Sequence, residues 1–203
     1  MQVAHSAFGL QPIDRQGLWA TNDGRYREYA HDLLAELLRL CEELKVEWPV
    51  PDGNRISRSA FPDVHRRARI RDRTSDSVRI YASMAVEGFL NFYGVLRLGQ
   101  AVFDEHYERL GLVPKLRQLL LVCNSCNIPK NHRACLLLDE ISRGRNALVH
   151  PKTREVAGAD AEQSRGATPV PERAQQAVDN MEAFFAAFVA LVPDAVPLLV
   201  RRS

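Results

Sequence analysis

The segment ACLLLDEISRGRNALVH, residues 134–150, combines an apolar helical pattern with a charged end. Its apolar side chains recur at helical spacing, so one face of a helix is predicted to be buried here. The same stripe continues onto Gly144 and Arg145, and a guanidinium in line with leucines is costly unless it is paired or faces a polar cleft. Pro151 disfavours helix at the residue before it, so His150 is expected in the last helical turn. The pattern therefore predicts an arginine and a titratable histidine close together at a helix end.

This helix end has a simple structural interpretation and a functional one. Arg and His side chains in a last helical turn commonly do no more than cap carbonyl groups and complement the helix dipole. The functional interpretation is a polar cleft in which the two side chains act on a ligand. The residues of this segment alone leave both interpretations open.

The other apolar patterns predict more helices. Residues 26–46 carry a stripe of leucines, and residues 74–98 repeat apolar side chains every three or four positions, with Gly99 as the expected stop. Helical patterns also cover residues 113–122 and 171–192. No stretch alternates long enough to predict a central sheet. We therefore expect an all-α protein, an up-and-down helical bundle with an N-terminal helical extension.

Changes in composition suggest three regions. Residues 1–73 would form an arm, a helix and an arginine-rich connection, residues 74–192 the bundle, and residues 193–203 a tail in which prolines end regular structure. Within the bundle, residues 152–170 are expected to form a mobile loop. The arginine-rich connection, residues 55–73, has seven arginines against two aspartates. It is either a solvated strand or loop, or an arm that follows RNA phosphates.

The whole-chain properties are those of an ordinary globular protein. The chain has 203 residues and a net charge of +2, so any affinity for nucleic acid must come from local patches. It has no apolar run of about 18 residues, so no membrane span is expected, and its N-terminus lacks the layout of a signal peptide. Its four cysteines are then expected to stay reduced, and the protein to be cytoplasmic.

A group of metal-ligand residue types lies just before the charged helix. Its spacing is close to that of a zinc knuckle without matching a standard one, and its members are Cys123, Cys126, His132 and Cys135. The alternative is a set of small residues at a helix–loop–helix junction, since free cysteine is often a buried apolar residue. We treat these residues as weak metal candidates and expect no cofactor.

Two segments of the chain resemble the HEPN superfamily, small all-α domains found in nucleotide-binding and RNA-cleaving proteins. One is residues 145–150, Arg-Asn-Ala-Leu-Val-His, which is similar to the superfamily motif of an arginine, a polar residue, apolar positions and a histidine at a helix end. The other is residues 83–91, similar to the acidic helix that packs against that motif. The resemblance covers about residues 74–192, and the first 70 residues lie outside it.

The resemblance implies a metal-independent endoribonuclease, such as a toxin or a phage-defence effector. His150 would be the acid and base for attack by an RNA 2′-hydroxyl, Arg145 would stabilise the charged phosphorane, and Asn146 would orient the histidine or the phosphate. The implied partners are RNA, a second copy of the chain and, for a toxin, an antitoxin protein. The alternative is a non-catalytic HEPN-like module that dimerises or binds RNA or a nucleotide.

The choice of arginine depends on helix geometry. On an ideal helix Arg145 and His150 are about 140° apart, whereas Arg143 shares a face with Asn146 and His150. We favour Arg145, because it interrupts the apolar stripe and directly precedes Asn146. Arg143 would then contact a phosphate or lie on the surface. On the acidic helix, Ser83, Glu87 and Asn91 form a polar face that is either plain surface or the border of a cleft where Glu87 meets an arginine.

Overall fold

The computed structural model describes residues 22–47, 62–149 and 170–199 of the 203. Within these ranges every regular element is a helix, which confirms the predicted all-α bundle. In chain order the elements are α1 (Asp23–Glu47), α2 (Pro62–Leu98), α3 (Gln100–His106), α4 (Leu112–Asn124), α5 (Arg133–Val149), α7 (Val170–Leu191), the 3-10 helix η1 (Pro193–Ala195) and α8 (Val196–Leu199).

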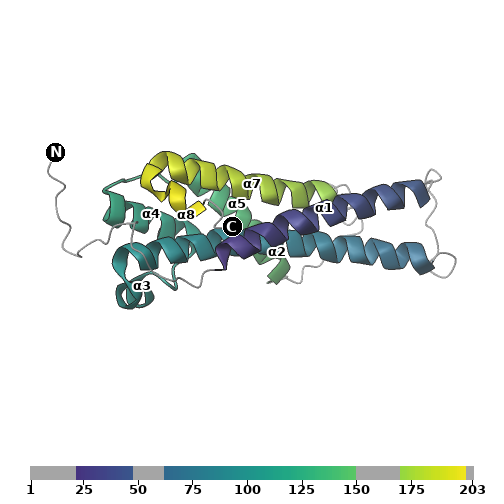
Figure 1. The fold of residues 1–203 in the computed structure, drawn as a ribbon, viewed down its shortest axis with the longest axis horizontal. Helices are drawn as coiled ribbons and strands as arrows, with labels where there is room; N and C mark the ends of the chain where they lie inside the picture. The colour runs from purple at the N-terminus through teal and green to yellow at the C-terminus, as the bar shows by residue number, and fades with distance from the viewer. Residues whose placement is uncertain (1–21, 48–61, 150–169, 200–203) are drawn as a thin grey trace, which may run out of the picture.

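The long helix α2 is the centre of the bundle, since it contacts α1, α3, α4, α5 and α7. Helices α1 and α2 run antiparallel, and the end of the bundle where α1 stops and α2 starts projects beyond α7 (Figure 1). Helix α5 packs against α2 and α7. Ile141, Gly144 and Arg145, in the C-terminal half of α5, line a cleft that these three helices share.

Aromatic side chains fill the core between α2 and α7. Phe89 lies edge-on to Phe185 and to Phe188, with ring centroids 5.4 and 5.0 Å apart. Tyr93 is edge-on to Phe188 at 5.1 Å. The apolar faces expected on residues 74–98 and 171–192 thus cover each other within one chain, and edge-to-face pairs of this kind stabilise a core by about 0.5–1.5 kcal/mol each beyond area burial.

Helix α2 begins at Pro62 rather than at the predicted residue 74. Proline is suited to the first helical position, because its missing N–H has no intrahelical partner there. Thr74 and Ser75, which are residue types that often cap a helix start, lie inside the helix, where their hydroxyls donate to the carbonyl oxygens of Ile70 (2.9 Å) and Val170 (3.1 Å). The second half of the arginine-rich connection is therefore helical, not a strand or loop, and the predicted boundary at residues 73/74 falls within α2.

Several smaller expectations have outcomes in the structure. Gly99 ends α2 with a φ of 85°, the left-handed conformation that glycine adopts most easily, as predicted. The prediction that Pro193 and Pro197 end regular structure was wrong, because Pro193 starts η1 and Pro197 lies within α8. None of the helices in the described ranges is long and apolar enough to cross a membrane.

Some predictions fall outside the described residues. They are those for the N-terminal arm, for Arg55 and Arg58, for His150 and for residues 152–169 of the predicted loop 152–170; its last residue, Val170, begins α7.

Candidate functional site

Arg145 lies on the inner side of α5, where it meets α2. Its Nη2 is 3.2 Å from Oε2 of Glu87, and each of the two side chains is 36% exposed. The residues that precede Arg145 in the same stripe, Leu138 and Ile141, are buried. The guanidinium therefore continues the apolar stripe, as the sequence predicts, and its cost there is offset by a carboxylate. Glu87 therefore meets an arginine, as one interpretation of the polar face of α2 holds, but it does not line the cleft described below.

Arg143 and Asn146, the polar residues on either side of Arg145, are both exposed. Arg143 is 70% exposed and pairs with Asp139 one turn earlier, Nη2 to Oδ2, at 2.8 Å. Asn146 is exposed, and its Oδ1 accepts a hydrogen bond of 3.2 Å from Nη1 of Arg145. The structure thus brings Arg145, Asn146 and Glu87 together and leaves Arg143 on the outer face.

The polar face of α2 continues into the bundle beyond Glu87. Asn91 accepts a hydrogen bond of 2.6 Å from Nζ of Lys115, whose side chain is fully buried. That ammonium also donates to the carbonyl oxygen of Glu108 at 3.1 Å and lies 5.5 Å from the ring centroid of Phe103. Burial lowers the pKa of Lys115, and the negative charges of Glu87 and Glu108 oppose that change. Sequence reasoning missed Lys115, although it sits one turn before Leu119 on an apolar face.

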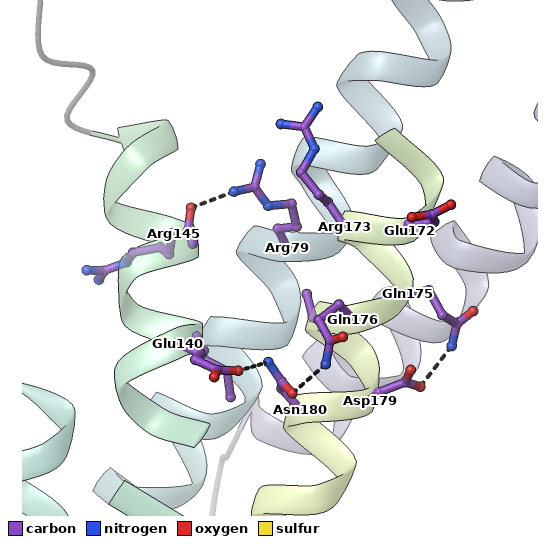
Figure 2. Close-up of a pocket in the computed structure, with 12 residues that line it drawn as sticks. Arg79, Glu140, Arg145, Glu172, Arg173, Gln175, Gln176, Asp179 and Asn180 are labelled. Atoms are coloured by element: carbon purple, nitrogen blue, oxygen red, sulfur yellow. Dashed lines mark hydrogen bonds between the residues drawn. The ribbon is translucent and has the colours of Figure 1, made fainter. Parts of the chain in front are cut away.

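A cleft of about 540 Å³ lies on the other side of α5, between α5, α7 and α2. Figure 2 shows two guanidiniums, those of Arg79 and Arg173, at one end of it. At the other end lies a chain of polar groups centred on Asn180, which is 8% exposed. Its Nδ2 donates to Oε2 of Glu140 at 2.9 Å, and its Oδ1 accepts from Nε2 of Gln176 at 2.8 Å. The cleft is therefore cationic at one end, and the other end is lined by amides and by two carboxylates, those of Glu140 and Asp179.

Arg79 connects the cleft to the helix that carries the motif. Its side chain is 14% exposed, and its Nη2 donates to the carbonyl oxygen of Gly144 at 3.0 Å. Burial lowers the pKa of Arg79; the carboxylate of Asp76 opposes this, and the positive charge of Arg173 adds to it. Sequence reasoning missed both arginines. Arg79 could have been found, since it lies four residues before Ser83 on the same polar face of α2.

The guanidinium of Arg145 points away from those of Arg79 and Arg173 (Figure 2). Arg145 contributes to the wall of the cleft but directs its charge toward Glu87. Guanidiniums therefore lie on two sides of the C-terminal half of α5, and the one of Arg145 is paired with Glu87. An extended polyanion that crosses this end of the bundle could contact both.

The cysteine-rich segment does not form a metal site in the described residues. Cys123 and Cys135 are buried, and burial raises the pKa of the Cys123 thiol to about 11. Nδ1 of His132 accepts a hydrogen bond of 3.2 Å from the N–H of Ala134, so this ring caps the start of α5. In residues 22–47, 62–149 and 170–199 no three His, Cys, Asp or Glu side chains gather in a way that could hold a metal ion.

Comparisons of the chain with protein-family models, with curated proteins and with solved structures found no match.

Proposed function

We propose that this protein is a metal-independent endoribonuclease of HEPN type. The observation that carries the proposal is the position of Arg145, half-buried on the inner side of α5 and held by Glu87. Arg145 precedes His150 by five residues, in a segment that resembles the HEPN motif. A second, independent support is the arginine pair on the other side of α5, because RNA carries a phosphate at every nucleotide.

The proposed reaction needs only the groups of the motif. His150 accepts the proton of an RNA 2′-hydroxyl, whose oxygen attacks the adjacent phosphorus. The P–O bond to the 5′-oxygen breaks, and the protonated imidazole returns a proton to that oxygen. Arg145 donates hydrogen bonds to the non-bridging oxygens as their charge grows. Asn146, already bonded to Arg145, holds the guanidinium or the phosphate in place. The products are a 2′,3′-cyclic phosphate and a 5′-hydroxyl.

The biological setting is part of the same proposal. As in HEPN proteins, two copies of the chain would pair so that their motifs line one RNA cleft. A cytoplasmic toxin held in check by an antitoxin protein, or a phage-defence effector, would fit such an activity.

One observation favours the alternative, a non-catalytic HEPN-like module for dimerisation or for RNA or nucleotide binding. Arg145 already has a carboxylate partner, and the Arg145–Glu87 pair ties α5 to α2. Arg145 would therefore have a structural role in the fold even in a protein without catalytic activity. The two functions differ in their dependence on His150.

The discriminating experiment is an RNA cleavage assay with EDTA present throughout. The wild-type protein is expected to cleave, and His150→Ala to lose about 10²–10⁴-fold in rate, the usual contribution of a general acid–base group. His106→Ala is the matched control, because His106 lies on α3 with a side chain that is 55% exposed. Equal rates for the wild type and His150→Ala would reject the enzyme and leave the binding module.

A further inference from the structure

Among the residues that the structure describes, the two arginines of the α5–α7 cleft have no strong anionic partner. Nη1 of Arg79 is 3.5 Å from Oδ1 of Asp76, whose side chain is 51% exposed, so this ion pair is weak. Arg173 has no hydrogen bond or ion pair with any described residue. The carboxylate of Glu172 points away from both guanidiniums (Figure 2). Two guanidiniums that face one space without a carboxylate between them repel each other, and an anion bound between them would remove that repulsion.

The rest of the cleft suits the organic part of such an anion. Its volume of about 540 Å³ is far larger than a phosphate needs and lies within the ~300–1,000 Å³ of small-molecule sites. Its far end offers an amide from Gln176 and a carboxylate from Glu140, groups that can bond polar ring edges. The internal bonds of Asn180 fix both of these groups in position. A phosphate at one end and a polar ring at the other describe a nucleotide.

We propose that this cleft binds one nucleotide of the RNA strand, with the phosphate between Arg79 and Arg173 and the base against Gln176 and Glu140. This inference rests on the proposed function, because only that function identifies the bound strand as RNA. Arg79 donates to the carbonyl oxygen of Gly144, directly before Arg145, so a phosphate held by Arg79 lies beside the motif. The cleft therefore positions the strand next to the reacting phosphodiester and takes no part in the chemistry.

The test is a binding measurement with a short 2′-O-methyl oligonucleotide, which has no free 2′-hydroxyl and cannot be cleaved by the proposed reaction. Fluorescence polarisation of the labelled oligonucleotide gives Kd for the full chain at several salt concentrations. Arg173→Gln removes one exposed charge that has no partner to lose among the described residues. Arg109→Gln is the matched control, since Arg109 is exposed and comes three residues after the end of α3, a helix that lies away from the start of α7 (Figure 1).

Arg173→Gln is expected to weaken binding roughly 5- to 10-fold and to reduce the slope of log K against log salt by about 0.7, the value for one phosphate contact on a single strand. Gln176→Leu is expected to weaken binding without a change in that slope, because it removes an uncharged contact. Arg109→Gln is expected to leave both quantities unchanged. Equal effects of Arg173→Gln and Arg109→Gln would overturn the site.

Two further ligands identify the source of the phosphate. Adenosine monophosphate and orthophosphate are each titrated as competitors of the oligonucleotide. The proposal requires both to bind at least tenfold more weakly than the strand. If either competitor binds as tightly as the oligonucleotide, the RNA assignment is overturned, since the cleft would then bind a free phosphate compound.

The outcome separates this inference from the proposed function. If His150→Ala stops cleavage and Arg173→Gln weakens binding, both stand. If cleavage depends on His150 but Arg173→Gln leaves Kd unchanged, only the proposed nucleotide site in the cleft is rejected. Binding that depends on Arg173, in a protein that does not cleave, rejects the enzyme alone.

Discussion

Arg145 is a charged residue in the apolar stripe of a helix, and its surroundings explain how it is tolerated. The guanidinium is only partly withdrawn from solvent and has Glu87 at 3.2 Å. A pair with this exposure stabilises a fold by at most about 1 kcal/mol, so it holds the arginine in place without binding it tightly. A substrate phosphate could replace the carboxylate as the acceptor at small cost.

The two arginines of the motif allow a direct comparison. We expect Arg145→Ala to reduce the single-turnover cleavage rate by about 10²-fold, because it removes a donor to the developing charge. Arg143→Ala should reduce that rate at least tenfold less, since Arg143 is on the outer face and paired with Asp139. Each variant replaces one arginine of α5 by alanine, and the two positions are two residues apart. The two variants therefore change the net charge and the helix propensity equally. A larger loss in Arg143→Ala would show that the wrong arginine has been assigned.

Arg145, Glu87 and Arg173 show which residues of a site can be predicted from a sequence. Arg145 was identifiable because it interrupts a local stripe, and Glu87 because it belongs to a polar face at spacing four. Arg173 was not, since nothing local marks it and its meeting with Arg79 depends on how α7 packs against α2. The role of a side chain can be predicted when the pattern of its own helix determines it. The role cannot be predicted when it depends on how two helices pack against each other.

At the scale of elements, α1 is tied to α7 by one carboxylate. Glu182 accepts hydrogen bonds from Nε of Arg27 at 2.7 Å and from Nε2 of His31 at 2.8 Å, and Nη2 of Arg27 bonds its second oxygen. Burial by itself raises the pKa of Glu182, but the bonds from Arg27 and His31 outweigh it, so the pKa is lowered. Helix α1 is therefore docked through a charged group as well as through leucines.

Glu182→Gln is expected to lower the free energy of unfolding at pH 7 by about 1–2 kcal/mol, because charged hydrogen bonds become neutral ones. The lowered pKa means that the carboxylate is favoured in the folded state. Its contribution is present above the ordinary value of 4.5 and is lost as pH falls through the lower folded pKa. Urea unfolding of the wild type and the variant should therefore converge toward acid pH.

The matched control for that experiment is Glu36→Gln. Glu36 also pairs with an arginine of α1, Arg39, but the side chains are 44% and 58% exposed. A surface pair three residues apart contributes little to stability, because water and salt screen its charges. If the two variants lose equal stability, the link between α1 and α7 is no stronger than a surface contact.

Helix positions were largely predictable, and the start of α2 shows why one was not. Apolar periodicity predicted α1, α4, α5 and α7 to within a few residues, because their buried faces repeat at helical spacing. Residues 62–73 have no such stripe, and Thr74 and Ser75 resemble N-cap residues. None of the described side chains of residues 62–73 is buried, so the segment is helical through good helix formers such as arginine and alanine and through its continuity with the packed part of α2, beside which α1 runs (Figure 1).

At the scale of the whole molecule, the predicted homodimer rests on the resemblance to HEPN proteins, whose paired motifs share a cleft. The core between α2 and α7 adds no argument for a second copy, because Phe89, Phe184 and Phe188 are all buried within a single chain. The dimer therefore stays a prediction that depends on the proposed function.

A mass measurement in solution tests it. We expect light scattering after gel filtration to give twice the chain mass at micromolar protein, and the Arg143→Ala and Arg145→Ala variants to give the same mass. A monomer at that concentration would argue against a shared active cleft. A monomer that still cleaves RNA would place the whole reaction on one chain.

The central claim is that His150 and Arg145 cleave RNA by attack of a 2′-hydroxyl, and the ends of the products test it most directly. An RNA oligonucleotide cleaved in EDTA should yield a 2′,3′-cyclic phosphate and a 5′-hydroxyl, read by mass spectrometry. The same oligonucleotide with a single 2′-deoxy sugar at the cleaved position should stay intact at that bond. Products with a 5′-phosphate, or cleavage beside the deoxy sugar, would contradict the account.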